Sequence, residues 1–370
     1  MVQYFVNIYN IPLKSLLLSI FLALHAMAKA HNTEDSTLNI QDIRNKFNDG
    51  VNLSLYEHYW EHPDSLLKAD IAAKLEAVHK AGFTSIRLPV AYDLFLLPHS
   101  NQLRPQLIER LKEVRTICSQ LHISLVITYH YGKLTNDNDL DEREKVIAIW
   151  KQVQNAFKGV CYDSLVFNLY NEPTLNRDNW KRDVTYIAKT LRKQDASRYY
   201  IIGGTNYNSI DELRELGNIN VDKVLYEFHF YEPFIFTHQG ADWTDGKTKI
   251  TNLPYPYKRK EMPQVSNDAI KSSADDYERY PDEANKQFVK DRLKEIVKYC
   301  RKHDMPVICT EAGVITAAPE QYRNNYLQDI TSILYELAVP TILWDYDQKF
   351  SVVDGQGKPL HGVQGWLKPG

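Results

Sequence analysis

The feature that most restricts the fold is a regular alternation of short apolar segments with longer amphipathic ones. The short runs, rich in β-branched and aromatic residues, have the length of strands, and the segments between them have the apolar repeat of helices. The eight runs are GVNLSL (50–55), SIRLPV (85–90), SLVITYH (124–130), SLVFNLYNEP (164–173), RYYIIG (198–203), KVLYEFHFY (223–231), PVICTEAG (306–313) and TILWDY (341–346). Parallel strands need such crossovers, and eight units close into a barrel. The pattern predicts a single-domain α/β fold, a (β/α)8 TIM barrel.

Seven helical segments connect these strands. They are expected at residues 65–80, 104–121, 142–157, 178–193, 210–216, 283–302 and 321–337, with a long irregular loop after strand six at about 232–281. The alternative is an open, doubly wound sheet. That fold would need a glycine-rich phosphate-binding turn after the first strand, and the sequence GVNLSLYE is no such turn.

Polar side chains stand near the carboxyl end of seven of the eight predicted strands; strand five offers nothing comparable. They are Asn52, Arg87, His130, Asn171 with Glu172, His229 with Tyr231, Glu311 and Trp344. Polar groups in otherwise apolar strands are costly to bury unless they are paired. Because the carboxyl ends of barrel strands meet at one mouth, we expect these side chains to form one site there.

Two carboxylates at that mouth, Glu172 and Glu311, suggest cleavage of a glycosidic bond. That reaction needs one protonated and one ionised carboxyl group facing each other. Arg87 and Tyr231 are suited to hold one of them ionised by charge and hydrogen bonding. Trp344 offers a flat apolar face to a sugar. Taken singly, a strand-end glutamate is as often merely solvated, and Trp344 is as often a core aromatic.

The ordered set resembles glycoside hydrolase family 5, the cellulase-type retaining glycosidases. The likeness lies in GVNLS, SIRLPV, VITYH, FNLYNEP, EFHFYEP, TEAG and ILWDY, and it spans about residue 45 to the C-terminus. It implies that Glu172 is the acid/base and Glu311 the nucleophile. It also implies that Asn171 binds the sugar 2-hydroxyl, while Arg87 and Tyr231 orient Glu311 and keep it ionised.

The same resemblance assigns the remaining positions. His130 and His229 would line the cleavage subsite, with His229 tuning the acid/base, and Trp344 would stack under the sugar that is cleaved. Without the surrounding set, each histidine would be read as a satisfied core imidazole. One departure is Tyr131, where many family members carry a second consecutive histidine. This departure concerns one sugar contact and not the chemistry.

The segment FTHQGADW (236–243), in the loop after strand six, resembles bacterial endoglucanases of the family. We therefore expect cleavage of internal β-1,4 bonds of a glucan, with a β-mannanase or an exo-β-glucanase as alternatives. The loop supplies Trp243, Tyr255 and Tyr257 as candidate stacking platforms, and His238, Gln239 and Asp242 as candidate polar contacts. Two alternatives of other classes are a non-catalytic carbohydrate-binding barrel and a structural scaffold.

The N-terminus carries an apolar run, SLLLSIFLALHAMA (15–28), which follows Lys14 and leads into Ala28-Lys29-Ala30. This pattern predicts a signal peptide over residues 1–30, a catalytic domain over residues 31–370, and a secreted or periplasmic protein. The run is shorter than the roughly 20 residues of a membrane span. The alternative is an uncleaved N-terminal anchor.

Composition limits the classes of partner and cofactor that the chain is expected to bind. The chain has 44 basic and 47 acidic residues, a net charge of −3, and no basic block interleaved with aromatics, so we expect no nucleic acid partner. We expect a polysaccharide or oligosaccharide substrate, no stable membrane association after cleavage of the leader, and a monomer. No cluster has metal-ligand spacing, so we expect neither metal nor cofactor. The four cysteines (118, 161, 300 and 309) show no CxxC spacing and are expected to be mostly free, buried thiols.

Overall fold

The computed structural model of the protein describes residues 40–160, 164–244, 246 and 248–367. All of them belong to one compact unit, Ile40–Gly370. The predicted leader and Cys161 lie outside the described residues. The other three cysteines are buried free thiols, as expected. Within the described part, no helix combines the length and apolarity needed to cross a lipid bilayer.

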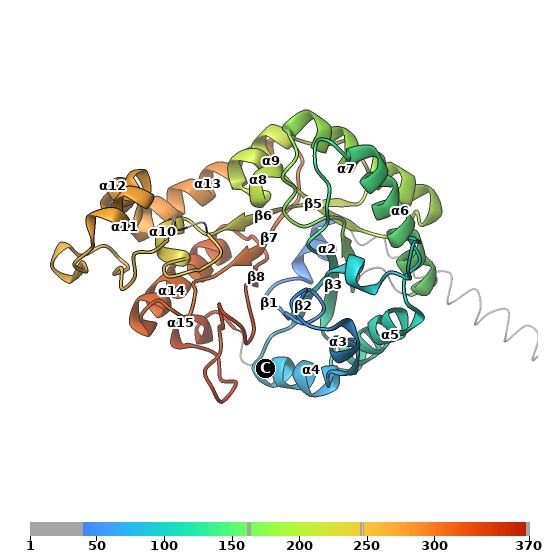
Figure 1. Cartoon of the computed structure of the whole chain (residues 1–370), viewed down its shortest axis with the longest axis horizontal. Helices are drawn as coiled ribbons and strands as arrows, with labels where there is room; N and C mark the ends of the chain where they lie inside the picture. Colours follow the sequence, from blue (N-terminus) through green and yellow to red (C-terminus); the bar gives the residue numbers. More distant parts are fainter. Residues whose placement is uncertain (1–39, 161–163, 245, 247, 368–370) are drawn as a thin grey trace, which may run out of the picture. The chain divides into compact units, whose positions relative to one another are not determined.

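Eight parallel strands form the centre of this unit (Figure 1). They are β1 (Gly50–Asn52), β2 (Ser85–Val90), β3 (Ser124–Tyr129), β4 (Leu165–Asn168), β5 (Tyr200–Gly203), β6 (Val224–Phe230), β7 (Val307–Ala312) and β8 (Ile342–Leu343). The neighbour order is β7-β6-β5-β4-β3-β2-β1-β8. Cys309 of β7 pairs with Thr341, and its N–H donates to the Pro340 carbonyl at 2.9 Å. These contacts link β7 to β8, so the TIM barrel is confirmed and the open sheet is wrong.

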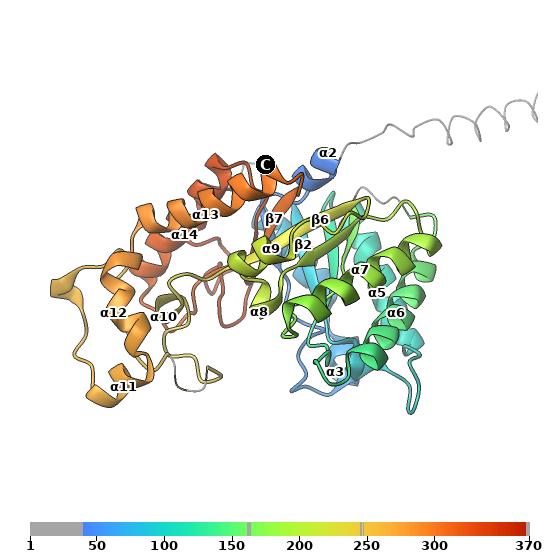
Figure 2. The ribbon, with the colours of Figure 1, turned by 90° about the horizontal axis from the view of Figure 1, so that it is seen from above.

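Helices surround the strands, as Figures 1 and 2 show. They are α2 (Ile40–Asn45), α3 (Pro63–Lys68), α4 (Ile71–Lys80), α5 (Pro105–Gln120), α6 (Asp139–Ala156), α7 (Arg177–Gln194), α8 (Thr205–Asn208), α9 (Ile210–Leu216), α10 (Phe234–Thr237), α11 (Asn267–Ser272), α12 (Ala274–Glu283), α13 (Lys286–Lys302), α14 (Glu320–Glu336) and α15 (His361–Gln364). The 3₁₀ turns η1 (Tyr92–Phe95) and η2 (Arg259–Glu261) complete the set. The predicted helix over 65–80 is two helices, because Ala69 is extended and Asp70 caps α4 by accepting the Ala73 N–H.

The chain between β6 and α13 is not the irregular loop that the sequence predicted. It contains α10, η2, α11 and α12, and in both ribbon views α11 and α12 lie out beyond α10, away from the strands (Figures 1 and 2). The Tyr280 hydroxyl of α12 donates to the Pro254 carbonyl at 2.7 Å, so the excursion is tied together by its own buried contacts.

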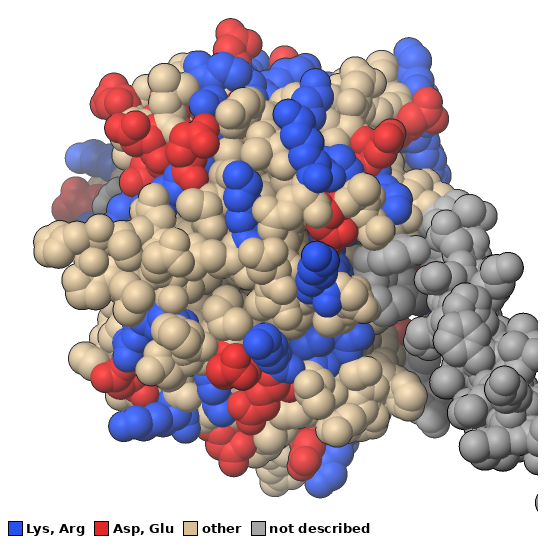
Figure 3. Space-filling view, turned by 90° about the vertical axis from the view of Figure 1, so that its right-hand side faces the viewer, with Lys and Arg blue, Asp and Glu red and all other residues tan. Residues whose placement is uncertain are grey.

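Strand residues alternate between the helix-facing core and the barrel interior, because side chains on a strand have a period of two. On β3, Leu125, Ile127 and Tyr129 pack in the helix-facing core, while Val126 and Thr128 lie between them on the inward side. The outer helices carry basic and acidic residues intermixed (Figure 3), with ion pairs such as Arg143 to Asp183 at 3.1 Å between α6 and α7.

A bulge interrupts this alternation between β6 and β7. Phe228 pairs with Cys309, but the next pair is His229 with Glu311, which leaves Thr310 as an extra residue. The Thr310 hydroxyl donates to Glu227 Oε2 at 2.5 Å inside the barrel. As a result, two consecutive residues of β7, Thr310 and Glu311, both face inward.

Candidate active site

Arg87 is the centre of the polar network at the barrel mouth. Its side chain is fully buried on β2, and its Nη1 donates to Glu311 Oε1 at 2.7 Å and to Asn52 Oδ1 at 2.9 Å. Nη2 donates to Asn171 Oδ1 at 2.6 Å and Nε to Asn168 Oδ1 at 3.0 Å. The guanidinium thereby joins residues from β1, β2, β4 and β7, and its buried charge is paired with that of Glu311.

Glu311 lies within a cage of donors. Besides Arg87, the Tyr231 hydroxyl donates to its Oε2 at 2.8 Å, and His229 Nδ1 lies 3.5 Å from the same oxygen. Burial raises the pKa of Glu311 above its ordinary value, while His229, Arg87 and the Tyr231 hydroxyl act in the opposite direction. These three neighbours favour the ionised form of the carboxyl group.

Glu172 stands just beyond β4 with a left-handed backbone, φ 48°. This conformation is uncommon for a residue with a side chain and is frequent at functional sites. Its Oε1 lies 2.8 Å from His229 Nδ1, and its side chain remains 29% exposed. Burial raises the pKa of Glu172 to about 7, opposed by the charge of Arg87. This carboxyl group is therefore protonated in slightly acidic solution.

The Nδ1 atom of His229 lies near both carboxylates, and the contact of its Nε2 atom with Asn208 shows which ring nitrogen carries the hydrogen. Asn208 Nδ2 lies 3.3 Å from both His229 Nε2 and Glu227 Oε1. The Glu227 carboxylate requires the amide nitrogen, not its oxygen, at that point. Nε2 of His229 is then the acceptor, so Nδ1 carries the hydrogen and donates it to Glu172. Burial lowers the pKa of His229, which is consistent with this neutral form.

Asn208 reaches His229 through unusual backbone. It ends a run of left-handed residues with φ of 49°, 60° and 53° at Asn206, Tyr207 and Asn208. Gly203 makes room for its side chain, since a Cβ at Gly203 would lie 2.3 Å from Asn208 Oδ1. Sequence reasoning missed Asn208 together with Asn168 and Glu227. For Asn168 and Glu227, the available signal was a polar residue at an inward position of strands four and six.

His130 and Trp344 form a stacked pair at the mouth. Their rings are 5.7 Å apart and 5° from parallel. His130 is 3% exposed, whereas Trp344 is partly exposed. Burial, together with the charge of Arg87, holds the pKa of His130 well below its ordinary value, so the imidazole is neutral. Of the nine side chains predicted for this site, eight thus lie at or just beyond the carboxyl end of a strand, while Arg87 lies in the middle of β2.

Most of the loop candidates are not free to bind a sugar. Tyr255 is fully buried, and Gln239 is fully buried with its amide donating to the Phe236 carbonyl at 3.0 Å, so both predictions are wrong. Tyr257 packs partly buried against the core. Trp243 is 48% exposed beneath the Lys349 ammonium, which also pairs with Asp242 at 3.2 Å. His238 is 9% exposed, stacked on Phe234 at 4.1 Å.

Two further buried acids, which the sequence analysis did not single out, stand near Trp344. Asp345 follows it directly, and its Oδ1 accepts the Gln348 N–H at 2.9 Å. Burial raises the pKa of Asp345 to about 8. Glu57, 2% exposed, accepts the Leu55 N–H at 2.8 Å, and burial raises its pKa as well.

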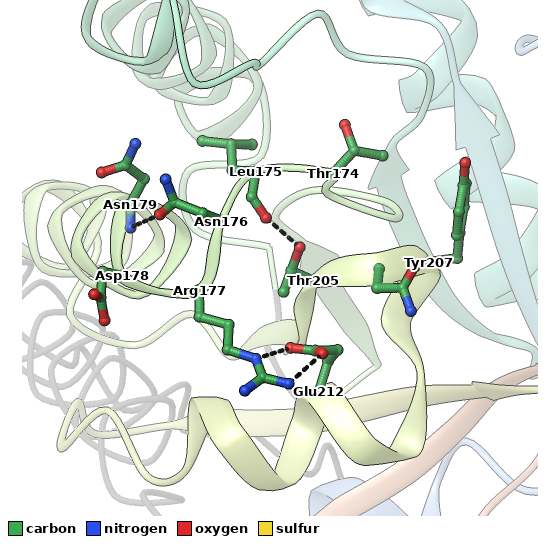
Figure 4. Close-up of a pocket in the computed structure, with 10 residues that line it drawn as sticks. Thr174, Leu175, Asn176, Arg177, Asp178, Asn179, Thr205, Tyr207 and Glu212 are labelled. Atoms are coloured by element: carbon green, nitrogen blue, oxygen red, sulfur yellow. Dashed lines mark hydrogen bonds and ion pairs between the residues drawn. The ribbon is translucent and has the colours of Figure 1, made fainter.

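A cavity of about 770 Å³ opens beside the end of β4 (Figure 4). Its wall is polar and comes from the chain after β4 and from the chain after β5. The lining residues are Thr174, Leu175, Asn176, Arg177, Asp178, Asn179, Thr205, Asn206, Tyr207 and Glu212. Arg177 and Glu212 form a two-point ion pair across it, with both distances 2.7 Å.

The chemistry available at the mouth follows from the two carboxyl groups. One oxygen of Glu172, one of Glu311 and a His229 nitrogen all lie within 4.8 Å of one another. In the described part of the chain, this is also the one group with a spacing suitable for a metal ion. A proton donor and an anion this close can act together on one acetal carbon.

Comparison with known proteins gives a consistent result. The family model described as cellulase (glycosyl hydrolase family 5) matches residues 44–350. Endoglucanase C of Acetivibrio thermocellus is 26% identical over 335 residues, which cover 85% of this chain and 95% of that protein. Endoglucanase 3 of Fibrobacter succinogenes is 27% identical over 344 residues, covering 85% of this chain and 52% of that protein.

Solved structures share the fold. Endoglucanase Cel5A of Thermotoga maritima superposes with a TM-score of 0.74 at 20% identity, over 89% of this chain and all of that one. Structures of the same protein are described as complexes with mannotriose, TM-score 0.73, and with cellobiose, TM-score 0.73.

Proposed function

We propose, from the premise that this chain belongs to glycosyl hydrolase family 5, that it is a secreted enzyme cleaving internal β-1,4 bonds of a glucan by double displacement. As a member of that family, it is a glycoside hydrolase acting on β-1,4 glycosidic bonds. The observation that carries the mechanism is the pair of carboxyl groups, which lie close together and have different surroundings.

In the first step, a Glu311 oxygen forms a bond to the anomeric carbon as the bond to the departing oxygen breaks. The proton of Glu172 passes to that oxygen, and a glycosyl-enzyme ester remains on Glu311. The donors around Glu311 favour the anionic form that must attack, and the raised pKa of Glu172 keeps its proton available. We expect Asn171, whose Oδ1 accepts a hydrogen bond from Arg87, to bind the sugar 2-hydroxyl.

In the second step, Glu172 removes a proton from water, the water oxygen bonds to the anomeric carbon, and Glu311 is released. Glu172 has lost its proton in the first step and is therefore ready to act as the base. The N–H at His229 Nδ1 stabilises that carboxylate in the interval. Two inversions at one carbon give net retention.

The spacing of the carboxyl groups supports retention over inversion. Retaining enzymes hold them about 5–5.5 Å apart and inverting enzymes about 6.5–9.5 Å, because the inverting reaction must fit a water molecule. One oxygen of Glu172 lies within 4.8 Å of one oxygen of Glu311, a close approach that favours the shorter spacing of the retaining class. Proton NMR of the first-formed product should show the β-anomer. The α-anomer as first product would contradict double displacement.

Chemical rescue separates the two roles. With an activated aryl β-cellobioside, Glu172→Ala still forms the glycosyl-enzyme, because a good leaving group needs no proton. Azide then enters the space of the lost carboxyl and gives the β-glycosyl azide. Glu311→Ala should not give this product. Formation of the β-azide by Glu311→Ala alone would reverse the assignments.

Glucan is the proposed substrate because two relatives that match 85% of this chain are named endoglucanases. Mannan is the second candidate, since the Thermotoga maritima protein was crystallised with mannotriose as well as with cellobiose. Carboxymethylcellulose, lichenan, glucomannan, xyloglucan and galactomannan should be compared by reducing-sugar release. We expect the first two to be cleaved to mixed oligosaccharides. Cellobiose as the sole early product would instead indicate exo action.

Secretion is proposed from the sequence of residues 1–30, with its apolar run and small-residue cleavage pattern. Sequencing of the N-terminus of protein recovered outside the cytoplasm should give a start near His31. A start at Met1 in a membrane fraction would favour the uncleaved anchor. We also propose a monomer, which sedimentation analysis of the mature chain would test.

A further inference from the structure

Glu227 lies fully buried inside the barrel, beneath the active site, and takes part in no step of the chemistry above. On β6, Tyr226 and Phe228 pack in the helix-facing core, so Glu227 and His229 share the inward face of the strand. A buried carboxylate is costly unless hydrogen-bond donors surround it. The partners of Glu227 therefore show what holds it there.

Three donors bind Glu227, and they are shared unequally between its two oxygens. Asn168 Nδ2 at 2.6 Å and Asn208 Nδ2 at 3.3 Å both donate to Oε1. The Thr310 hydroxyl donates to Oε2 at 2.5 Å. Gly203 pairs with Glu227 across β5 and β6, and a Cβ there would lie 2.3 Å from Asn208 Oδ1 and 3.0 Å from Glu227 Cγ. The glycine thus leaves the space in which one carboxylate oxygen receives two asparagine side chains.

The Asn208 amide takes its orientation from Glu227. His229 Nε2 can meet this amide as a donor or as an acceptor, depending on the tautomer, so it imposes no orientation. Asn208 Oδ1 is buried and has no hydrogen-bond partner within the described part of the chain. The Glu227 carboxylate can only accept, so it holds Nδ2 toward itself and toward His229 Nε2. The hydrogen of His229 is thereby kept on Nδ1, which donates it to Glu172 at 2.8 Å.

The second asparagine connects Glu227 to Arg87. Because Asn168 Nδ2 points to Glu227, its Oδ1 is left to accept the Arg87 Nε–H at 3.0 Å. The other contact of Nδ2, with the Ile201 carbonyl, is longer at 3.3 Å. Arg87 in turn donates to Glu311 at 2.7 Å. Two residues therefore separate Glu227 from each carboxyl group of the proposed mechanism.

We propose that Glu227 is a positioning residue for both carboxyl groups at the barrel mouth. Through one asparagine it fixes the hydrogen of His229 on Nδ1, and through the other it anchors the guanidinium of Arg87. It acts by accepting hydrogen bonds at one oxygen, without touching the substrate. The proposal rests on the proposed function, but the position of the His229 hydrogen can be measured with no substrate present.

Two substitutions separate hydrogen-bond acceptance from charge, because both remove the charge. Glu227→Gln keeps an oxygen for the two asparagines, since its amide nitrogen can donate to the Thr310 hydroxyl. Glu227→Leu keeps no acceptor, so the Asn208 amide is free to turn over. A difference between the two variants then reports the lost acceptor. Glu227→Met takes the place of Glu227→Leu if the latter does not fold, because a thioether accepts hydrogen bonds only weakly.

NMR of the protein labelled with ¹⁵N-histidine shows directly which ring nitrogen of His229 carries the hydrogen, and His229→Gln identifies its signals. At about pH 5.5 Glu172 is protonated, since burial raises its pKa to about 7, and so it does not hold the hydrogen on Nδ1. The hydrogen should then be on Nδ1 in the unmodified protein and in Glu227→Gln. In Glu227→Leu a second form with the hydrogen on Nε2 should appear, while Glu311, 3.5 Å from Nδ1, keeps part of the population in the first form.

Thr310→Val is the matched control. It removes the donor to Oε2 of Glu227 and leaves the donation by Asn168 and Asn208 to Oε1 in place. The His229 hydrogen should therefore stay on Nδ1. Absence of the second form in Glu227→Leu would overturn the proposal, and so would its appearance to the same extent in Thr310→Val.

Kinetics tests the two connections separately. On a dinitrophenyl glycoside, whose leaving group needs no proton, kcat/KM of Glu227→Leu should be about threefold below that of Glu227→Gln, through the weaker anchoring of Arg87. On cellulose-derived oligosaccharides the difference should reach about tenfold, because the His229 connection is lost as well. Equal kcat/KM for the two variants on both substrates would contradict a positioning role. If the unmodified enzyme cleaves no β-glycoside, the proposed function fails, while the NMR result still decides what Glu227 does to His229.

Discussion

Two corners of the barrel mouth each hold one glutamate, and the surroundings of the two differ. At the β7 corner, Glu311 receives hydrogen bonds from Arg87 and Tyr231 and is 4% exposed. At the β4 corner, Glu172 has His229 as its one hydrogen-bond partner among the described side chains and is 29% exposed. The two corners therefore differ in the donors that surround the carboxyl group, as the proposed roles of anion and proton donor require.

A third glutamate sharpens this comparison. Glu227 lies deeper in the barrel, fully buried, and accepts from Asn168 at 2.6 Å, Thr310 at 2.5 Å and Asn208 at 3.3 Å. Every one of these donors is a neutral side chain from a neighbouring segment, and none of them opens to the mouth. Neighbouring donors, and access to the substrate, therefore decide what a buried carboxyl group does, not its residue type.

The largest expected effect separates the two corners directly. Glu311→Ala should lower kcat by about 10³-fold or more on every substrate, because no covalent intermediate can form. Glu172→Ala should do the same on cellulose-derived oligosaccharides but far less on a dinitrophenyl glycoside, whose leaving group needs no proton. Equal losses for both variants on both substrates would remove the distinction between the corners.

Tyr231→Phe tests the donors at the β7 corner. It removes the hydroxyl that favours the Glu311 carboxylate, so the pKa of Glu311 rises and the acidic limb of the pH profile moves to higher pH. We expect a loss in kcat of about 10- to 100-fold. Tyr226→Phe is the control, because Tyr226 lies on β6, the strand that Tyr231 directly follows, but its hydroxyl donates to Asn218 at 2.9 Å. An unmoved acidic limb in Tyr231→Phe would contradict the role of the hydroxyl.

The alkaline limb of the pH profile tests the surroundings of Glu172 at the β4 corner. Activity should fall above a pKa of about 7, as Glu172 loses the proton that it must donate. Asn208→Ala removes the amide that donates to His229 Nε2 and so no longer fixes the hydrogen on Nδ1. The hydrogen bond from Nδ1 to Glu172 is therefore weakened. The limb should then move to higher pH, with a roughly tenfold loss in kcat/KM.

Asn206→Ala is the control for Asn208→Ala, since both replace an asparagine in the same left-handed run. Asn206 is exposed and should shift neither limb. If both variants shift the alkaline limb equally, the effect comes from backbone strain and not from His229.

The smallest expected effect concerns stability. The pKa of Asp345 is raised to about 8 by burial, against an ordinary value of 3.8. Between these values the folded state holds a proton that the unfolded state releases, so stability falls as pH rises from about 4 to 8. Asp345→Asn should flatten this fall, by on the order of 1 kcal/mol or more at pH 8. Denaturant unfolding at both pH values measures it, with exposed Asp347→Asn as the control.

The fold could be predicted from the sequence wherever residue types recur with a regular spacing. Strands β1 to β8 and the polar residues at their ends were predictable, because alternating segments and costly buried polar groups are both visible in one dimension. Asn208 was not, because it enters the site through a left-handed run after β5, the one strand that carried no polar end. Tyr255 was mistaken for a surface platform because a loop aromatic is buried only when the tertiary fold covers it.

The helices of the excursion were missed for a related reason. α11 and α12 have few apolar positions, and α12 contains Pro281, so their local sequence indicates a loop. Tertiary contact at Tyr280 overrides that preference.

The bulge at Thr310 allows two consecutive residues of β7, Thr310 and the proposed nucleophile Glu311, to face the barrel interior. Along a regular strand, odd and even positions point to opposite faces, and a residue following an inward threonine would point into the helical layer. The extra residue in the bulge interrupts this alternation, so Glu311 faces the barrel interior as Thr310 does. Deleting Thr310 would leave Glu311 directly after the outward Cys309 and still opposite His229, but would remove the hydroxyl that donates to Glu227. One inserted residue thus allows a single strand both to bind the buried Glu227 and to present the proposed nucleophile.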